Sequence, residues 1–184
     1  SLGRPPKSDS ALGEAVGEVS TLRAAEWAGG SSMLTGAALF SGFYLNELLM
    51  KLLLRHDPHP GLFDLYAQTL PMLGADGGDG EVSSQAALRA FELSLLKELG
   101  VLPDLSLVTL TQQVVAPEGR YALVPEAGVT EPRVSEGSLS GDMLIGLQAA
   151  LQHGSLAALQ HACSRGLPEL RAALASRVTR TTGR

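Results

Sequence analysis

The feature that most constrains this chain is its longest apolar run, which covers residues 33–54. Leucine and alanine recur along it at helical spacing and share a wide face. This pattern predicts either one long helix or two short helices that meet near residues 41–42. Asn46, Glu47 and Lys51 interrupt the run, and three polar groups in such a stretch argue against a membrane-spanning helix. The sequence therefore predicts a soluble, cytoplasmic protein.

Prolines and glycines mark the expected ends of the next elements. Residues 57–60 read Asp-Pro-His-Pro, a stiff connector in which each proline disfavours helix at the residue before it. Helical spacing resumes over residues 62–73. Residues 74–80 are rich in glycine and aspartate but lack the ligand spacing of an EF-hand, so we interpret them as a linker. A further amphipathic helix is expected over residues 84–99, ended by Gly100.

The second half of the chain begins with a change of pattern. Between residues 105 and 134, Val, Leu and Thr dominate, and residues 125–128 read as a turn between short strands. Helical patterning returns over residues 139–178, with breaks at Gly154 and Gly166. The expected fold class is therefore α+β and mainly α: a helical domain with a small β insertion.

Charge and composition limit the classes of partner. Lys and Arg total 14 against 19 Asp and Glu, and aromatic residues are only 4% of the chain. So few aromatic side chains argue against a stacking platform for single-stranded nucleic acid. The basic residues are segregated, because residues 165–184 hold five arginines against Glu169 alone, whereas residues 31–164 carry six basic and fourteen acidic groups. Any DNA contact is expected to use local basic groups.

Candidate catalytic and metal-binding groups are few. His56 and His59, with Asp57 between them, lie in a proline-rich extended segment without a third ligand nearby, which favours exposed histidines over a zinc site. His153, His161 and Cys163 could supply a nucleophile and base, but nothing in their spacing requires the side chains to meet. The sequence has neither a Walker A motif nor a GxGxxG motif. It predicts a helical binding or scaffold protein, with no enzyme activity and no cofactor.

Eight segments carry a recognisable family pattern. They are Ser1-Leu-Gly-Arg-Pro-Pro-Lys-Ser8, Gly17-Glu-Val-Ser-Thr-Leu22, Ala25-Glu-Trp27, Phe43-Tyr-Leu-Asn-Glu-Leu-Leu49, Arg55-His-Asp-Pro-His-Pro60, Leu62-Phe-Asp-Leu-Tyr66, Leu88-Arg-Ala-Phe-Glu-Leu-Ser-Leu-Leu-Lys-Glu-Leu-Gly100 and Arg120-Tyr-Ala-Leu-Val-Pro-Glu-Ala-Gly128. Together they strongly resemble the bacterial recombination mediator family RecO. The segment over residues 88–100 is similar to that family's hallmark helix.

The resemblance implies a domain organisation. Residues 1–30 are similar to the last part of an N-terminal OB barrel, but a barrel needs about five strands, so only a partial remnant is expected there. Residues 31–184 would form the helical domain, with the β insertion at about 103–134. Some members carry four zinc-binding cysteines in that insertion. Here it has none, and zinc is not expected.

The resemblance also implies a function in DNA repair and recombination. Members of the family bind single- and double-stranded DNA, anneal strands coated by the single-strand-binding protein SSB, and join RecR to load RecA. The expected DNA-binding residues are Arg4, Lys7, Arg177 and Arg180, because annealing requires neutralised backbones. The expected groove for the acidic, apolar-ended SSB tail is formed by Arg89, Phe91, Leu95 and Lys97. Nucleoid association would follow from such a role.

Two other functions stay open at this point. The first is a helical adaptor that binds protein partners and not DNA, which the acidic balance of residues 31–164 favours. The second is a hydrolase that uses His153, His161 or Cys163. For the expected tail groove, the alternative is structural, because Phe91 and Leu95 each also fit a hydrophobic core.

Overall fold

The fold was analysed in a computed structural model, which describes residue 24 and residues 33–54, 57–74, 80–132 and 138–181. The side chains of Ser176 and Arg180 lie outside this description. The expected barrel remnant over residues 1–30 also lies outside it, apart from Ala24.

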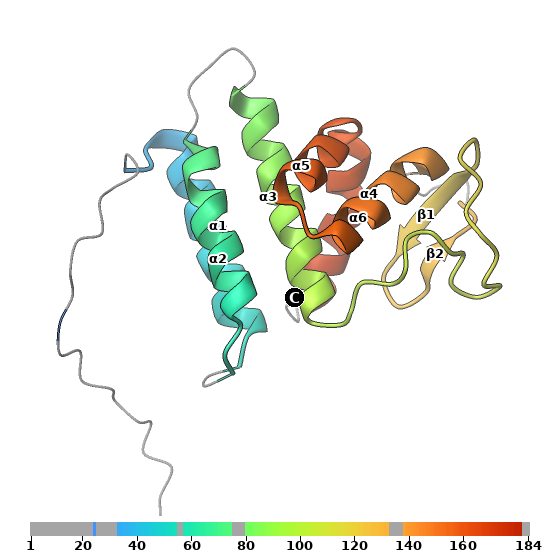
Figure 1. Ribbon diagram of the computed structural model, residues 1–184, viewed down its shortest axis with the longest axis horizontal. Helices are drawn as coiled ribbons and strands as arrows, with labels where there is room; N and C mark the ends of the chain where they lie inside the picture. Colours follow the sequence, from blue (N-terminus) through green and yellow to red (C-terminus); the bar gives the residue numbers. More distant parts are fainter. Residues whose placement is uncertain (1–23, 25–32, 55–56, 75–79, 133–137, 182–184) are drawn as a thin grey trace, which may run out of the picture. The chain divides into compact units, whose positions relative to one another are not determined.

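Six helices and a small sheet make up the described part of the chain, as the sequence predicted. In chain order the elements are α1 (Gly36–Leu52), α2 (Pro60–Leu73), α3 (Gly80–Glu98), β1 (Arg120–Val124), β2 (Gly128–Thr130), β3 (Leu139–Ser140), α4 (Gly141–His153), α5 (Leu156–Ser164) and α6 (Leu167–Thr181). Figure 1 shows α1 and α2 side by side on one side of α3, with α4, α5 and α6 on its other side. None of the described helices is both long and apolar enough to cross a bilayer.

Helix α3 is the centre of the helical unit because two hydrophobic clusters meet on it. Its residues Ala86, Ala90, Leu93 and Leu96 pack with the β insertion and with α4–α6. Its residues Ala87, Leu88, Phe91 and Leu95 pack with α1, α2 and Val178 of α6. A helix that is covered on both sides is expected to be apolar around most of its circumference. Helix α3 meets this expectation from Ala86 to Leu96, apart from a few polar positions.

The helix ends follow from local sequence. Pro60 occupies the first turn of α2, where its missing N–H removes no helical hydrogen bond. Helix α4 begins at the cap residue Ser140, whose hydroxyl oxygen accepts from the Met143 N–H, and it ends at Gly154 in the left-handed region. Gly141 fits against the insertion, because a Cβ there would meet the Ala116 carbonyl oxygen at 1.8 Å.

The β insertion is a three-stranded antiparallel sheet in the order β2-β1-β3. Strands β1 and β2 are joined by the turn expected at residues 125–128, where Gly128 has a φ of +76°. One expectation was wrong: residues 139–140 form β3 instead of opening the next helix. Leu139 is buried and pairs with Tyr121, and Ser140 serves as the helix cap, so the chain stays extended until Gly141.

Candidate functional site

Three polar side chains gather inside the helical unit, where α1 meets α3. The Tyr44 hydroxyl donates to Oε1 of Glu92 at 2.5 Å, and Nη2 of Arg89 lies 3.0 Å from the same oxygen. Arg89 and Glu92 are one helical turn apart on α3, and they are only 8% and 1% exposed. The hallmark segment of the sequence therefore places a charged pair in the interior.

The electrostatics of this cluster are those of a buried, incompletely paired site. Burial raises the pKa of Glu92, although the Arg89 charge and the Tyr44 hydrogen bond both act to lower it. The same burial and the nearby Glu92 carboxylate raise the pKa of Tyr44. Within the described residues, Nε of Arg89 and Oε2 of Glu92 have no hydrogen-bond partner. A buried ion pair adds little to the net free energy of unfolding, but removing one of its partners lowers that free energy strongly.

The expected tail-binding groove is not formed by Arg89, Phe91 and Leu95. Phe91 and Leu95 are fully buried in the cluster shared by α1, α2 and α3, and Arg89 is turned to Glu92. Arg89 is not at the surface because α3 is covered on both sides, which the sequence of α3 alone does not reveal. A tail peptide could reach these three side chains only if the core opened.

Lys97, the fourth residue expected at that groove, is on the surface. It is exposed in the last turn of α3, and its Nζ donates to the Leu151 carbonyl oxygen at 2.6 Å. Beside it is a cavity of about 180 Å³ between α2, α3, α4 and α5. Its lining residues are Gly61, Leu62, Leu65, Ser94, Lys97, Glu98, Ala150, Leu151, Gly154, Ser155, Leu156 and Leu159. Lys97 thus stands at the edge of a hollow that combines leucine side chains with polar groups, among them the Glu98 carboxylate.

The expected DNA-binding arginines differ in their surroundings. Arg177 is 7% exposed, and its Nη1 and Nη2 donate to the carbonyl oxygens of Val101 and Val124 at 2.8 and 2.9 Å. Burial lowers the pKa of Arg177. A side chain held this way has a structural role and offers no free face to a phosphate, so this geometry does not support the expected DNA contact of Arg177. Arg4, Lys7 and the Arg180 side chain lie outside the described residues.

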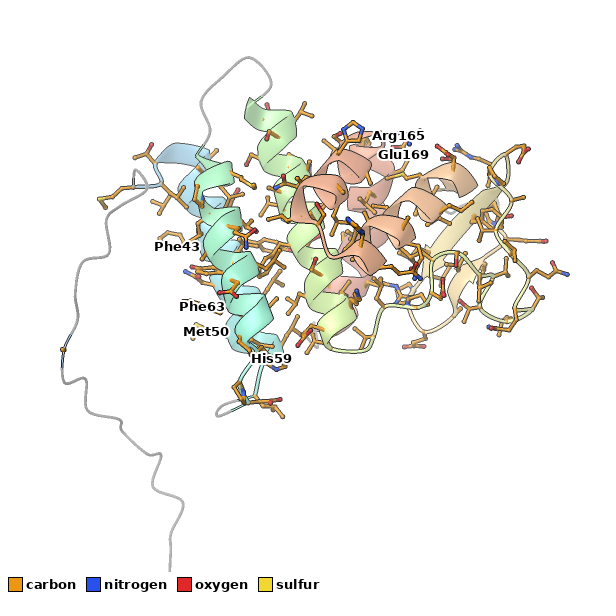
Figure 2. The ribbon with its side chains drawn as sticks, viewed as in Figure 1. Phe43, Met50, His59, Phe63, Arg165 and Glu169 are labelled. Atoms are coloured by element: carbon orange, nitrogen blue, oxygen red, sulfur yellow. The ribbon has the colours of Figure 1, made fainter. Side chains whose placement is uncertain are left out.

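The two arginines of α6 whose side chains are described differ in burial. The buried positions of α6 are Leu170, Leu174, Arg177 and Val178, which recur every three or four residues. Arg177 falls on that stripe, whereas Arg171 does not and is exposed. Arg165, labelled in Figure 2, is exposed and pairs with Asp142 at 2.6 Å. Apolar spacing in the sequence alone does not separate the two, because Arg171 lies four residues after Leu167 and three before Leu174.

The candidate nucleophile and metal ligands are not assembled into a site. Cys163 is fully buried, and burial raises its pKa to about 12, so the thiolate form is strongly disfavoured. In the described ranges, no three His, Cys, Asp or Glu side chains are placed to hold a metal ion. His56 lies outside those ranges. His59 bonds to Glu98 and pairs with Asp57.

The geometry so far is that of a helical module with a buried ion pair and surface hollows. Comparison with known proteins shows which protein family this module resembles. The family described as "Recombination protein O C terminal" matches residues 33–116. The proteins named DNA repair protein RecO from Albidiferax ferrireducens and Polaromonas sp. are 48% and 47% identical over 163 and 159 residues, each covering 85% of this chain. The chain belongs to the RecO family.

The match to these relatives is partial on their side. The chain spans 64% and 63% of the length of those two proteins, and 52% of the relative from Variovorax paradoxus, which is 49% identical over 135 residues. The family description calls the part that residues 33–116 match C-terminal.

Proposed function

We propose that this protein acts in DNA repair and recombination as a mediator: it binds single- and double-stranded DNA, anneals SSB-coated strands and, with RecR, helps to load RecA. The observation that carries the proposal is the family match over residues 33–116, together with relatives named as DNA repair proteins. A mediator of this kind works on DNA in the cytoplasm, at the nucleoid. It requires no cofactor and catalyses no bond-breaking step.

DNA binding is expected to use exposed cations at the two ends of the chain. Arg171 is exposed on α6, and Arg4, Lys7 and Arg180 remain proposed contacts by sequence. Each phosphate that such a group neutralises releases bound counterions, so affinity must fall as salt rises. Arg177 is left out of this proposed interface because both of its terminal nitrogens are held by backbone carbonyls.

A salt titration with a fluorescent oligonucleotide tests the DNA proposal. The full chain should bind, and affinity should weaken steeply with salt. Arg171→Gln should reduce the slope of log affinity against log salt concentration by about one, and it should weaken binding to all DNA sequences alike. Arg165→Gln, which removes a cation already paired with Asp142, is the matched control and should change binding less. Full-length RecO from Albidiferax ferrireducens serves as the positive control.

For the SSB tail, the Lys97 cavity is the better candidate than the interior of α3. The tail that the family binds is acidic and ends in an apolar residue, so it needs a cation beside an apolar hollow. Lys97 and the leucines of this cavity supply that combination on the surface. Of the four residues expected at the groove, only Lys97 stays in the proposal.

Anisotropy titration of a labelled SSB tail peptide tests the cavity. Lys97→Glu should weaken binding by about tenfold or more, because losing one partner of a desolvated charge pair typically costs about 2 kcal/mol or above. Lys51→Glu makes the same charge change on α1 and should leave the affinity unchanged. Lys97→Met separates loss of charge from repulsion. Equal affinity for all four proteins would remove the cavity from the proposal.

A protein adaptor without DNA binding is the second candidate function. It is favoured by the acidic balance of residues 31–164, with six basic and fourteen acidic side chains. If the chain failed to bind DNA at low salt while the full-length relative bound, the adaptor would be the better description of this part of the protein.

A further inference from the structure

The outer side of α1 exposes large apolar side chains in a row. Phe40, Phe43 and Met50 are 72%, 57% and 85% exposed, and they recur at three and seven residues, which places them on one helical stripe. Phe63 of α2, 70% exposed, lies on the same side as Phe43 and Met50 (Figure 2). Scattered single apolar residues are ordinary on a protein surface, but a contiguous group of this size indicates an interaction site.

Beside this stripe, α1 and α2 enclose a groove of about 410 Å³. It is lined by Asn46, Leu49, Met50, Leu53, Asp57, His59, Leu62, Phe63 and Tyr66. Six of these side chains are apolar or aromatic, and Tyr66 donates its hydroxyl hydrogen to Oδ1 of Asn46 at 2.6 Å. The groove therefore has an apolar body, and its other polar residues, Asp57 and His59, come from the end at which the chain connects α1 to α2.

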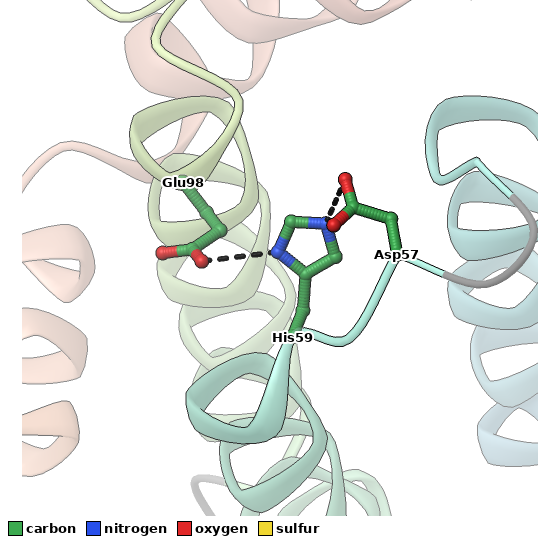
Figure 3. A network of polar contacts seen from close by, with 3 residues as sticks. All are labelled: Asp57, His59 and Glu98. Carbon is green, nitrogen blue, oxygen red and sulfur yellow. Dashed lines mark hydrogen bonds and ion pairs between the residues drawn. The ribbon is translucent and has the colours of Figure 1, made fainter.

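That end of the groove is acidic. His59 stands between two carboxylates: its Nδ1 lies 3.1 Å from Oε1 of Glu98, and its Nε2 lies 3.4 Å from Oδ2 of Asp57 (Figure 3). The hydrogen bond to Glu98 and the nearby Asp57 raise the pKa of His59. Even with His59 protonated, the three groups together carry a net negative charge, and both carboxylates are about half exposed. Asp64 of α2 is exposed as well.

Among the described residues, two lysines near the groove in the chain have other partners. Lys51 forms an ion pair with Glu47 one turn before it on α1. Lys97, next to Glu98 in the chain, is directed to the Leu151 carbonyl oxygen at the separate cavity on α3. Glu98 also lines that cavity, so its carboxylate stands beside Lys97 there and contacts His59 of the groove. Of the charged residues in the two linings, Asp57 and His59 belong to the groove, and Lys97 and Glu98 belong to the cavity.

We propose that the α1–α2 groove and the Phe40–Phe43–Met50 stripe bind an amphipathic helix of a protein partner. Its apolar side chains would lie along the groove, and a lysine or arginine near one end would face Asp57 and Glu98. Helix-in-groove recognition needs an apolar row at three- and four-residue spacing, and the length of the stripe suits it. The acidic end selects the sign of the partner's charge and rejects DNA and acidic tails by repulsion.

Labelled designed peptides test this proposal on the full chain. One peptide of about 18 residues, or five helical turns, carries leucine at helical spacing with lysine on the flanks. A second replaces every lysine by glutamate, and a third scrambles the first. The lysine peptide should bind at least about tenfold more tightly than either of the others, since charge complementarity and the apolar row must both be satisfied.

Matched variants locate the binding. Phe63→Ser and Met50→Ser should each weaken binding of the lysine peptide by at least about fivefold. Asp57→Asn should reduce the protein's preference for the lysine peptide over the glutamate peptide. Leu110→Ser is the control, because Leu110 is equally apolar and 81% exposed but lies outside the groove. All these side chains are on the surface, so melting temperatures should stay close to that of the unsubstituted chain.

Three results would overturn the proposal. The first is equal binding of the lysine and glutamate peptides. The second is a loss with Leu110→Ser as large as that with Phe63→Ser. The third is reversible self-association in sedimentation equilibrium that Phe63→Ser abolishes, which would make a second copy of the chain the occupant of this surface.

Discussion

Helices α1 and α3 are of similar length, yet they distribute polarity in opposite ways. Helix α3 places Arg89 and Glu92 in the interior, whereas α1 leaves Phe40, Phe43 and Met50 largely exposed. The cause is their position: α3 is packed between two hydrophobic clusters, and α1 contacts only one of them. In this fold, the number of layers that cover a helix therefore decides the burial of its side chains more than their residue type does.

The largest expected effect concerns the charged pair inside α3. Arg89→Met would leave the Glu92 carboxylate buried without its cation, so it should lower the free energy of unfolding by about 3–5 kcal/mol. The double variant Arg89→Met/Glu92→Leu should recover most of that loss, because it removes both charges. Urea denaturation of the two variants measures the difference. A single variant that costs less than the double one would show that the pair is not coupled.

A smaller effect is expected where α1 reaches the same cluster. Tyr44→Phe removes the hydroxyl that donates to Oε1 of Glu92 at 2.5 Å. Hydrogen bonds to charged groups contribute about 1.5–3 kcal/mol, and the free energy of unfolding should fall by that amount. Tyr66→Phe is the matched control, since its hydroxyl bonds to Asn46 at an exposed site and should matter less. Equal losses in both would contradict the assigned role of Glu92.

The pH dependence of stability should report the burial of Glu92. Its pKa in the folded protein is raised above the ordinary value of 4.5, so the folded state binds a proton more readily than the unfolded state. The contribution of Glu92 to the free energy of unfolding is fully present below pH 4.5 and is lost as pH rises through the pKa of the folded protein. The free energy of unfolding then falls by at most about 1.4 kcal/mol per pH unit. Glu92→Gln should flatten that part of the curve of unfolding free energy against pH. An unchanged slope would contradict the raised pKa.

The smallest effect is expected on the exposed side of α1. Phe43→Ser should change the free energy of unfolding by about 0.5 kcal/mol or less, since the side chain is more than half exposed. Phe91→Ala, at a fully buried aromatic position of α3, should cost about 3–5 kcal/mol. Thermal melts of the two variants compare the helices directly. A large loss for Phe43→Ser would mean that its face is covered within the protein.

Much of the fold was predictable from the sequence because its signals are local. The connector at residues 57–60, the breaks at Gly154 and Gly166 and the turn at residues 125–128 all act through the φ and ψ preferences of proline and glycine. Strand β3 was missed, because two residues carry no periodicity. Its pairing with β1 depends on a contact that is distant along the chain.

The candidate site was less predictable, because burial depends on packing between elements. Lys97 lies at the surface, next to a hollow whose walls come from four helices, and its role there stays a proposal. Arg89 and Arg177 were expected to contact partners, and both are buried. For Arg177, the apolar spacing of α6 does not give this result, because it does not separate Arg177 from the exposed Arg171. For Arg89, the surroundings are contributed by α1 and by the hydrophobic clusters on either side of α3.

Arg177 also links the end of the described chain to the β insertion. Its guanidinium holds the Val124 carbonyl at the end of β1 and the Val101 carbonyl just after α3. The last turns of α6 therefore cannot slide along their axis without pulling on both carbonyls. This brace couples α6 mechanically to the insertion, so a load applied to the exposed Arg171 of α6 is transmitted to strand β1, which lies more than forty residues earlier in the chain.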